Sequence, residues 1–334
     1  MFIRSYEPND EALAIHLWND ALPMDQINKE NFYRRIIYDI NFDPAKYFLL
    51  FDGKEPAGFL YCTKQLASDG GEVGVAGVGG VAGDKDGGGS SADASGGAPV
   101  KGWIVAMGVL RGYRRRGAGQ QLITAAEALL KSEGANQIIV GAYAENYFCP
   151  GVDKINYHDG VCFFQSMGYS AGGECCSMDI SLRDYVYPEK YKDKRRDLES
   201  QGYIFKLYEA CDTIPLRRFM RECFPHWLPN VRDCLLSGRA SERLILAIDK
   251  GGDAVGFVMR AMDGTEERFG PFGVNPNFQG IGLGSILFAE MMQSMIERRI
   301  FYTYFLWTSG RNLDIYSSWG MKIYRSYCMM EKTI

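Results

Sequence analysis

The feature that constrains this chain most is an internal repeat. A pattern of one valine, one basic or amide side chain and two glycines occurs twice with the same spacing. The first copy consists of Val109, Arg114, Gly117 and Gly119, and the second of Val274, Gln279, Gly282 and Gly284, so that Val274 follows Val109 by 165 positions. An apolar run precedes each copy and an amphipathic pattern follows it, which predicts a strand, a glycine turn and a helix. A repeated unit of this kind indicates two related domains of mixed α/β type.

The repeat continues beyond the predicted helices. Phe164 corresponds to Tyr316, an offset of 152, so the first half is longer between the two motifs, and we place the extra residues at 146–153. Two more strands are expected in each half, at 138–140 and 175–182 in the first and at 301–306 and 323–332 in the second. The fold class predicted from these elements is α/β (α+β), in two tandem domains.

Two segments interrupt this pattern. Residues 68–99 are dominated by glycine with small and polar residues, and such a segment gains too little from burial to offset its ordering entropy. We expect a flexible surface insert there. Residues 186–201 alternate basic and acidic side chains, which favours a solvated linker over a nucleic-acid site. The predicted domains are therefore residues 1–185, with the insert, and residues 202–334.

Composition excludes several classes of protein. Hydrophobic residues make up 46%, enough for a sizeable core, and 37 basic against 41 acidic side chains give a net charge of −4. We therefore expect no nucleic-acid or membrane partner. Nine cysteines without a CxxC pair and only three histidines favour a reduced, cytoplasmic protein without a structural metal. We expect a monomer or a homodimer.

The glycines of the repeat stand where a strand turns into a helix. Backbone N–H groups at a helix start converge there, and the helix dipole adds positive potential, so the turn is suited to an anion such as a pyrophosphate. A dinucleotide-binding fingerprint competes for the same glycines, but it requires G-x-G-x-x-G, and Ser285 stands where its last glycine belongs. The sequence therefore favours a phosphate-bearing ligand of another kind.

The segment 274–284 resembles the acyl-CoA motif of the GNAT superfamily of N-acetyltransferases, whose core is Q/R-x-x-G-x-G/A, and the segment 109–119 matches the same core. Residues 315–321 resemble the later helix of that family, L-Y-x-x-x-G-F. The whole chain looks like a tandem GNAT protein, as in mycothiol synthase-like enzymes. The resemblance implies, for each domain, a mixed, mostly antiparallel sheet flanked by helices, with two central strands splayed apart to admit acetyl-CoA.

The resemblance also implies the residues that hold acetyl-CoA. In the second domain they are Val274, Gln279, Gly280, Ile281, Gly282, Leu283, Gly284 and Ser285, and in the first Val109, Arg114, Arg115, Arg116, Gly117, Ala118 and Gly119. Tyr316 stands at the family's tyrosine, which can protonate the departing thiolate, whereas Phe164 has no donor. We therefore expect the second domain to be catalytic, with Glu267 as the candidate base, and the first to be non-catalytic.

The predicted function is an acetyl-CoA-dependent N-acetyltransferase that transfers acetyl directly to the amine of a small molecule or a peptide. Two alternatives stay open at this point. One is a CoA-binding sensor or scaffold with degenerate catalysis, which Phe164 favours for the first domain. The other is a related acyl transfer, as in aminoacyl ligases that use charged tRNA, against which the acidic balance argues.

Overall fold

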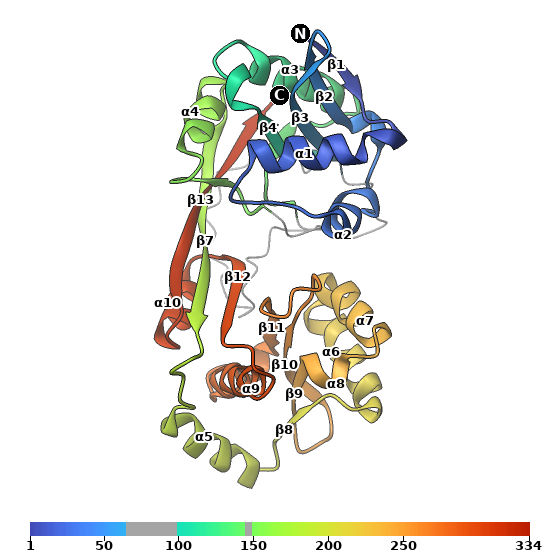
Figure 1. The fold of residues 1–334 in the computed structure, drawn as a ribbon. Coiled ribbons are helices and arrows are strands. Elements are labelled where there is room, and N and C mark those ends of the chain that lie inside the picture. Colours follow the sequence, from blue (N-terminus) through green and yellow to red (C-terminus); the bar gives the residue numbers. More distant parts are fainter. Residues whose placement is uncertain (65–98, 144–148) are drawn as a thin grey trace, which may run out of the picture. The chain divides into compact units, whose positions relative to one another are not determined.

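The computed structural model describes residues 1–64, 99–143 and 149–334 (Figure 1). The glycine-rich insert expected at 68–99 falls almost entirely outside the described residues, as does the start of the expected insertion at 146–153. The chain divides into two compact units. The described residues of the first unit are 1–64, 99–143, 149–175 and Arg325–Ile334, and those of the second are Cys176–Tyr324. Among the described helices, none is long and apolar enough to cross a membrane.

The sheet of the first unit is mostly antiparallel, with one parallel pair at β4 and β5. Its strands, in spatial order, are β1 (Phe2–Ser5), β2 (Tyr47–Asp52), β3 (Glu55–Lys64), β4 (Lys101–Val109), β5 (Gln137–Val140) and the end of β13 (Lys322–Thr333). The short β6 (Val152–Asp153) also pairs with β13. This order confirms the mixed sheet that was expected for the first half.

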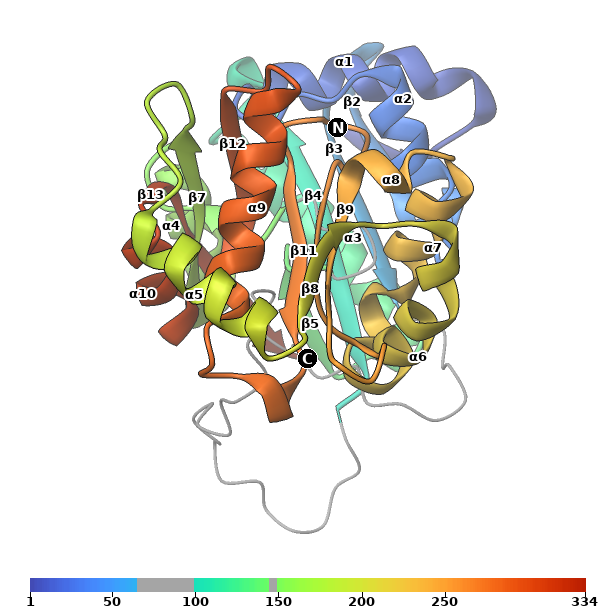
Figure 2. The ribbon, with the colours of Figure 1, turned by 90° about the horizontal axis from the view of Figure 1, so that it is seen from below.

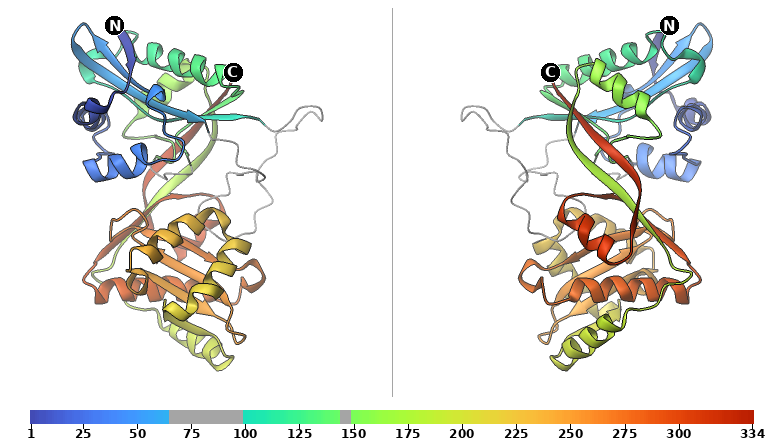
Figure 3. Two further views of the ribbon diagram at one scale, coloured as in Figure 1. Left: turned by 90° about the vertical axis from the view of Figure 1, so that its right-hand side faces the viewer. Right: turned by 90° about the vertical axis from the view of Figure 1, so that its left-hand side faces the viewer.

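Helices cover both faces of this sheet because β3 alternates its apolar side chains between them (Figure 3). On one face, Trp18 of α1 (Glu11–Ala21) stacks on Phe59 with ring centroids 5.2 Å apart. On the other face, Leu122 of α3 (Ala118–Ser132) belongs to the same buried cluster as Leu60. The remaining helices of this unit are α2 (Lys29–Phe32) and α4 (His158–Ser166).

The second unit has the same order of elements along the chain, but its strands divide between two sheets: four strands form one antiparallel sheet, and the other two pair with each other in a second sheet. Its strands are β8 (Ile204–Leu207), β9 (Leu244–Ile248), β10 (Ala254–Arg260), β11 (Phe269–Val274), β12 (Tyr302–Thr308) and part of β7 (Ser170–Ser181). Its helices are α5 (Glu189–Ser200), α6 (Thr213–Cys223), α7 (Leu228–Leu236), α8 (Ala240–Arg243), α9 (Leu283–Glu297) and α10 (Arg311–Ser318). Phe257 of β10 contacts Phe219 of α6, in the way that Phe59 contacts Trp18.

The predicted repeat is confirmed residue by residue at the glycine turns. Both α3 and α9 have 15 residues, and each begins after a glycine in the left-handed region, Gly117 with φ 82° and Gly282 with φ 101°. Each turn is preceded by a short 3₁₀ helix, at Arg111–Tyr113 and Pro276–Phe278. The two motifs therefore fold into the same strand, turn and helix.

The last strands of the two halves are exchanged between the units. In the first unit, β13 pairs with β5, for example Met330 with Val140. In the second unit, β7 pairs with β12, for example Met178 with Phe305. Each half of the chain thus contributes its final strand to the sheet of the other unit, a connection that the domain ranges 1–185 and 202–334 did not anticipate.

The segment expected to be a solvated linker, 186–201, is mostly the helix α5, which lies beside α9 in the second unit (Figure 2). Leu198 is buried there, and the Glu290 carboxylate of α9 accepts hydrogen bonds from Tyr187 Oη at 2.8 Å and from Arg195 Nη1 at 2.5 Å. A few anchors suffice to fix a helix whose other face is charged and solvated, so the segment between the two predicted domains is mostly helical.

Candidate functional site

The first unit has a pocket where β5 ends and β4 continues. The two strands pair from Lys101–Gln137 to Ile104–Val140, and Gly141 N–H then donates to Ile104 O at 2.9 Å. Beyond this point β4 runs on to Val109 without β5 beside it. A pocket of about 720 Å³ opens there, lined by β4, by the turn before α3 and by α4. Pockets of this size are typical of small-molecule and cofactor sites.

One end of the pocket is the glycine turn. Arg114 Nε donates to Val109 O at 2.9 Å and thereby fixes the start of the turn. Arg115 and Gly117 both have positive φ, 60° and 82°, and a Cβ added at Gly117 would meet no atom within 4 Å. The first N–H groups of α3 have no intrahelical acceptor, so this open turn is suited to bind a phosphate.

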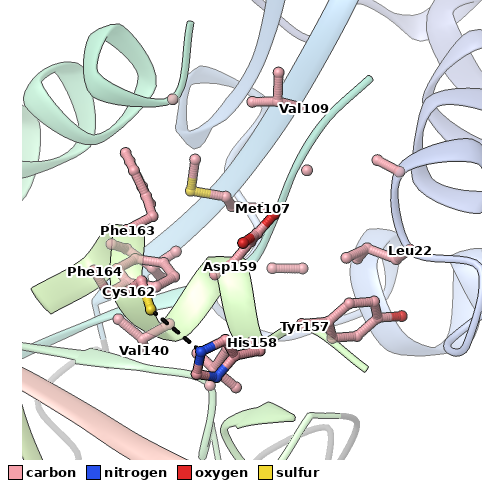
Figure 4. Close-up of a pocket in the computed structure, with 18 of the residues that line it drawn as sticks. Leu22, Met107, Val109, Val140, Tyr157, His158, Asp159, Cys162, Phe163 and Phe164 are labelled. Atoms are coloured by element: carbon pink, nitrogen blue, oxygen red, sulfur yellow. Dashed lines mark hydrogen bonds between the residues drawn. The ribbon is translucent and has the colours of Figure 1, made fainter. Parts of the chain in front are cut away.

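Another wall of the pocket is formed by the start of α4 (Figure 4). His158 Nε2 lies 3.6 Å from Cys162 Sγ, one helical turn away, and both side chains are exposed. Asp159 forms an ion pair with Arg115 of the glycine turn at 3.5 Å. Tyr157 Oη accepts the Met24 N–H at 3.0 Å, and burial followed by the Asp25 carboxylate raises the pKa of Tyr157 well above its usual range.

The residues expected from the sequence to act in catalysis do not include His158 or Cys162. The signal that links them is their spacing of four residues, which places two side chains on one face of a helix. Recognising it required the helix start to be placed at His158, and a glycine two residues later obscured that start in the sequence.

In the second unit, aromatic side chains fill the corresponding space. At four pocket-lining positions the second half has an aromatic residue in place of an aliphatic one: Ile104, Met107, Val140 and Met167 correspond to Phe269, Phe272, Phe305 and Trp319. These rings pack on one another, with centroids 5.9 Å apart for Phe272 and Trp319. A Cβ added at Gly284 would lie 3.3 Å from Phe272 Cζ and 3.6 Å from the Trp319 ring. The equivalent Cβ at Gly119 would lie 3.0 Å from Phe163 Cζ, so both turns are closely packed, and the two units differ in the four larger side chains beside β11.

Tyr316 belongs to this cluster. It is 5% exposed, and its ring centroid lies 4.6 Å from that of Phe305. Burial raises the pKa of Tyr316 well above its usual range. Glu267 lies just before β11, and its carbonyl accepts hydrogen bonds from Thr303 Oγ1 and the Tyr304 N–H, so its backbone helps to join β11 to β12. The catalytic roles of Tyr316 and Glu267 stay predictions.

The predicted ligand-binding residues divide between the units. In the first unit, Val109, Arg114, Arg115, Gly117 and Gly119 line the pocket, whereas Ala118 is buried and Arg116 is exposed away from it. In the second unit, Val274 and Leu283 are buried in the core, Ile281 packs against it, and Lys194 of α5 lies over Gly282. The other predicted positions there are Gln279, Gly280, Gly284 and Ser285, of which Gln279 donates to Val274 O at 3.5 Å.

The strand, glycine turn and helix present in both halves, with a mixed sheet that parts beside the turn in the first unit, define the acyltransferase class that the sequence resembles. Residues 13–148 and 202–316 match the acetyltransferase (GNAT) family, so more than half of the chain is covered. The chain belongs to the acetyltransferase (GNAT) family and has one domain of this family in each half. Comparison with curated proteins gives no match.

Several solved structures share the fold. The chain is similar to a GCN5-related glucosamine N-acetyltransferase region of a fungal multi-domain GH3 beta-N-acetylglucosaminidase, with a TM-score of 0.75 and 19% identity, over 99% of this chain and 38% of that one. It is also similar to a GCN5-related N-acetyltransferase from Sphaerobacter thermophilus, with a TM-score of 0.65 and 15% identity, over 99% and 95%. A tandem GNAT protein from the clavulanic acid biosynthesis pathway is similar with a TM-score of 0.62 and 12% identity, over 99% of this chain and 98% of that one. Identities this low show the fold alone.

Proposed function

We propose that the protein is an acetyl-CoA-dependent N-acetyltransferase and that the reaction takes place in the pocket of the first unit. The observation that carries this proposal is the course of the pocket, which runs from the open turn at Gly117 along β4 to the start of α4. A long acyl donor fits such a pocket with its pyrophosphate on the amides of α3 and its thioester beside Val140. The acceptor is the amine of a small molecule or a peptide.

The pocket side chains suggest how the proton is handled. During transfer, the amine nitrogen forms a bond to the thioester carbon, the carbon–sulfur bond breaks, and the amine loses a proton. Asp25 is bound by Arg325, and Asp159 is paired with Arg115. His158, whose ring is exposed at the pocket, is therefore the side chain that we assign to proton uptake. This assignment replaces Glu267, which lies in the second unit.

The proposal places catalysis in the half that the sequence analysis expected to be non-catalytic. The expectation rested on one hydroxyl, which Tyr316 has and Phe164 lacks. We give more weight to the four aromatic replacements beside Tyr316, because they occupy space that the acyl donor would need. Catalysis in the second unit stays the alternative site for the same reaction.

The test is release of free thiol from acetyl-CoA in the presence of polyamines, aminoglycosides, amino acids and peptide N-termini. Thiol release that depends on one of these amines, with a matching acetylated product by mass, supports the proposal. Tight binding of acetyl-CoA without turnover would instead support a CoA-binding sensor, an alternative that the hydroxyl-free Phe164 favours.

A further inference from the structure

Arg325 of β13 makes the densest set of ion pairs at the pocket of the first unit. Its Nη1 and Nη2 donate to the two carboxylate oxygens of Asp25 at 2.7 and 2.9 Å, and its Nε donates to Asp153 Oδ2 at 2.6 Å. Nη1 also reaches Met24 O at 3.4 Å. The Arg325 side chain is 9% exposed, so this is a largely desolvated bidentate pair, the geometry in which arginine is least replaceable by lysine.

The partners of Arg325 belong to two different walls of the pocket. Asp25 follows α1 and lines the pocket itself. Asp153 orders the other wall, because its carboxylate accepts the N–H groups of Ile155 and Asn156 at 2.9 and 2.8 Å, just before Tyr157. Although burial lowers the pKa of Arg325, the hydrogen bond and charge of Asp25 raise it overall, so the guanidinium stays charged.

These walls are formed by the residues after α1 and the residues just before α4, whereas Asp159 within α4 reaches Arg115 of the glycine turn. In Figure 4, Tyr157 and His158 lie at one end of the drawn residues and Val109 at the other. The donor pyrophosphate belongs at the Val109 end in the proposed function. The walls that Arg325 joins are therefore those that would face the acceptor amine and the thioester.

We propose that Arg325 is a positioning residue for the acceptor. It holds the wall that contains Asp25 against the wall formed by Asp153–Tyr157 in the pocket of the first unit. The proposal rests on the proposed function and adds a residue from the far end of the chain to it. By the 152-residue offset, Gly173 of β7 corresponds to Arg325. The first half therefore has no side chain of its own at this position, and the exchanged strand β13 supplies one.

The test compares Arg325→Lys and Arg325→Met with the unchanged full-length protein. Because lysine keeps the charge but cannot form the bidentate pair, we expect KM for the amine to rise about tenfold in Arg325→Lys and further in Arg325→Met. KM for acetyl-CoA should stay within about twofold, because both carboxylate partners of Arg325, Asp25 and Asp153, lie outside the turn that would hold the pyrophosphate. Equal rises in both KM values, or no rise for the amine, would overturn the proposal.

A matched control separates positioning from general stability. Arg4 also forms a bidentate pair with an aspartate of the first unit, Asp10, at 2.5 and 2.7 Å, but neither residue lines the pocket. Arg4→Lys should lower the melting temperature as Arg325→Lys does and leave both KM values unchanged. A selective rise in amine KM for Arg4→Lys would mean that any loosening of this unit gives the same effect, and would refute the specific role of Arg325.

A second readout does not depend on catalysis. Amide hydrogen exchange in the unliganded protein should become faster at residues 22–27 and 153–157 in Arg325→Lys, and not in Arg4→Lys. If the wild-type protein transfers acetyl to no amine, the proposed function fails, and faster exchange at both walls still supports the tie between them. Unchanged exchange at either wall would overturn it whatever the activity.

Discussion

The glycine that begins each repeated helix offers a matched test of which unit binds the acyl donor. Gly117→Val and Gly282→Val place the same side chain at the same point of the same turn, where φ is 82° and 101°. A β-branched residue at positive φ costs on the order of 1–3 kcal/mol. At roughly 2–4 °C per kcal/mol for units of this size, each variant should melt a few degrees lower than the parent and still fold.

The two variants should differ in affinity. At Gly117 the added side chain points into open space beside the pocket, so it would crowd an anion held by the amides of α3. Loss of one charge-assisted hydrogen bond, about 1.5–3 kcal/mol, corresponds to roughly a 10- to 150-fold weaker Kd. At Gly282 the added Cβ meets the flexible Lys194 side chain at 3.0 Å, in a unit whose space beside β11 is already filled. The affinity of the Gly282→Val variant for acetyl-CoA should therefore equal that of the parent.

Isothermal titration of acetyl-CoA into both variants and the parent measures this difference, with calorimetric melting as the check on folding. Weaker binding in Gly282→Val with normal binding in Gly117→Val would place the donor in the second unit and refute the reasoning from the aromatic cluster. If the parent binds two molecules of acetyl-CoA and each variant binds one, both turns hold the donor.

Three further outcomes are expected. Tyr316→Phe should leave turnover within about twofold of the parent in the thiol-release assay, whereas a fall of roughly 10²–10⁴-fold would restore Tyr316 as the acid. His158→Gln should lower kcat/KM by a similar factor, and an unchanged kcat/KM would exclude His158 as the base. Hydrogen bonds from Asn156, its backbone N–H and Arg325 outweigh burial and lower the pKa of Asp153 in the folded state. The free energy of unfolding should therefore fall as the pH drops below about 4. In urea unfolding measured at several pH values, the free energy of unfolding of Asp153→Asn should depend less steeply on pH than that of the parent. An equal pH dependence in the two proteins would contradict this.

Much of the fold followed from the sequence because the motif spacing is local. The valine, the glycines and the helical stripe lie within one continuous segment in each half, so strand, turn and helix were predicted together. A second repeat was missed. Glu7 and Asp10 cap a short 3₁₀ helix before α1, and Glu209 and Asp212 do the same before α6. The shared Tyr-Glu-x-x-Asp pattern was present in the sequence and would have placed the start of both domains.

The exchange of the last strands could not be predicted in the same way. Both β7 and β13 have 12 residues and occupy matching places in the repeat. The pairs that each strand forms in the other unit are therefore equivalent to those it could form in its own, as Met330 with Val140 and Met178 with Phe305 illustrate. Strand length and alternation fix the register of a pair, but they do not say which of two equivalent partners is chosen.

The sequence-based choice of the second half rested on one hydroxyl, and the proposal of the first half rests on the volume of the side chains around it. A pocket is empty space inside a unit, and its lining gives up packing that a filled core would have. A repeated fold that needs one such pocket is free to fill the other. Each of the four aromatic replacements adds buried apolar area, worth up to about 25 cal/mol per Å² removed from water. The positions Phe269, Phe272, Phe305 and Trp319 thus stabilise the second unit at the expense of ligand space, while their aliphatic counterparts keep the first unit open. A comparison of side-chain volumes at matching positions of the two halves therefore favours the first unit as the one that binds the donor, whereas the presence of the Tyr316 hydroxyl alone favours the second.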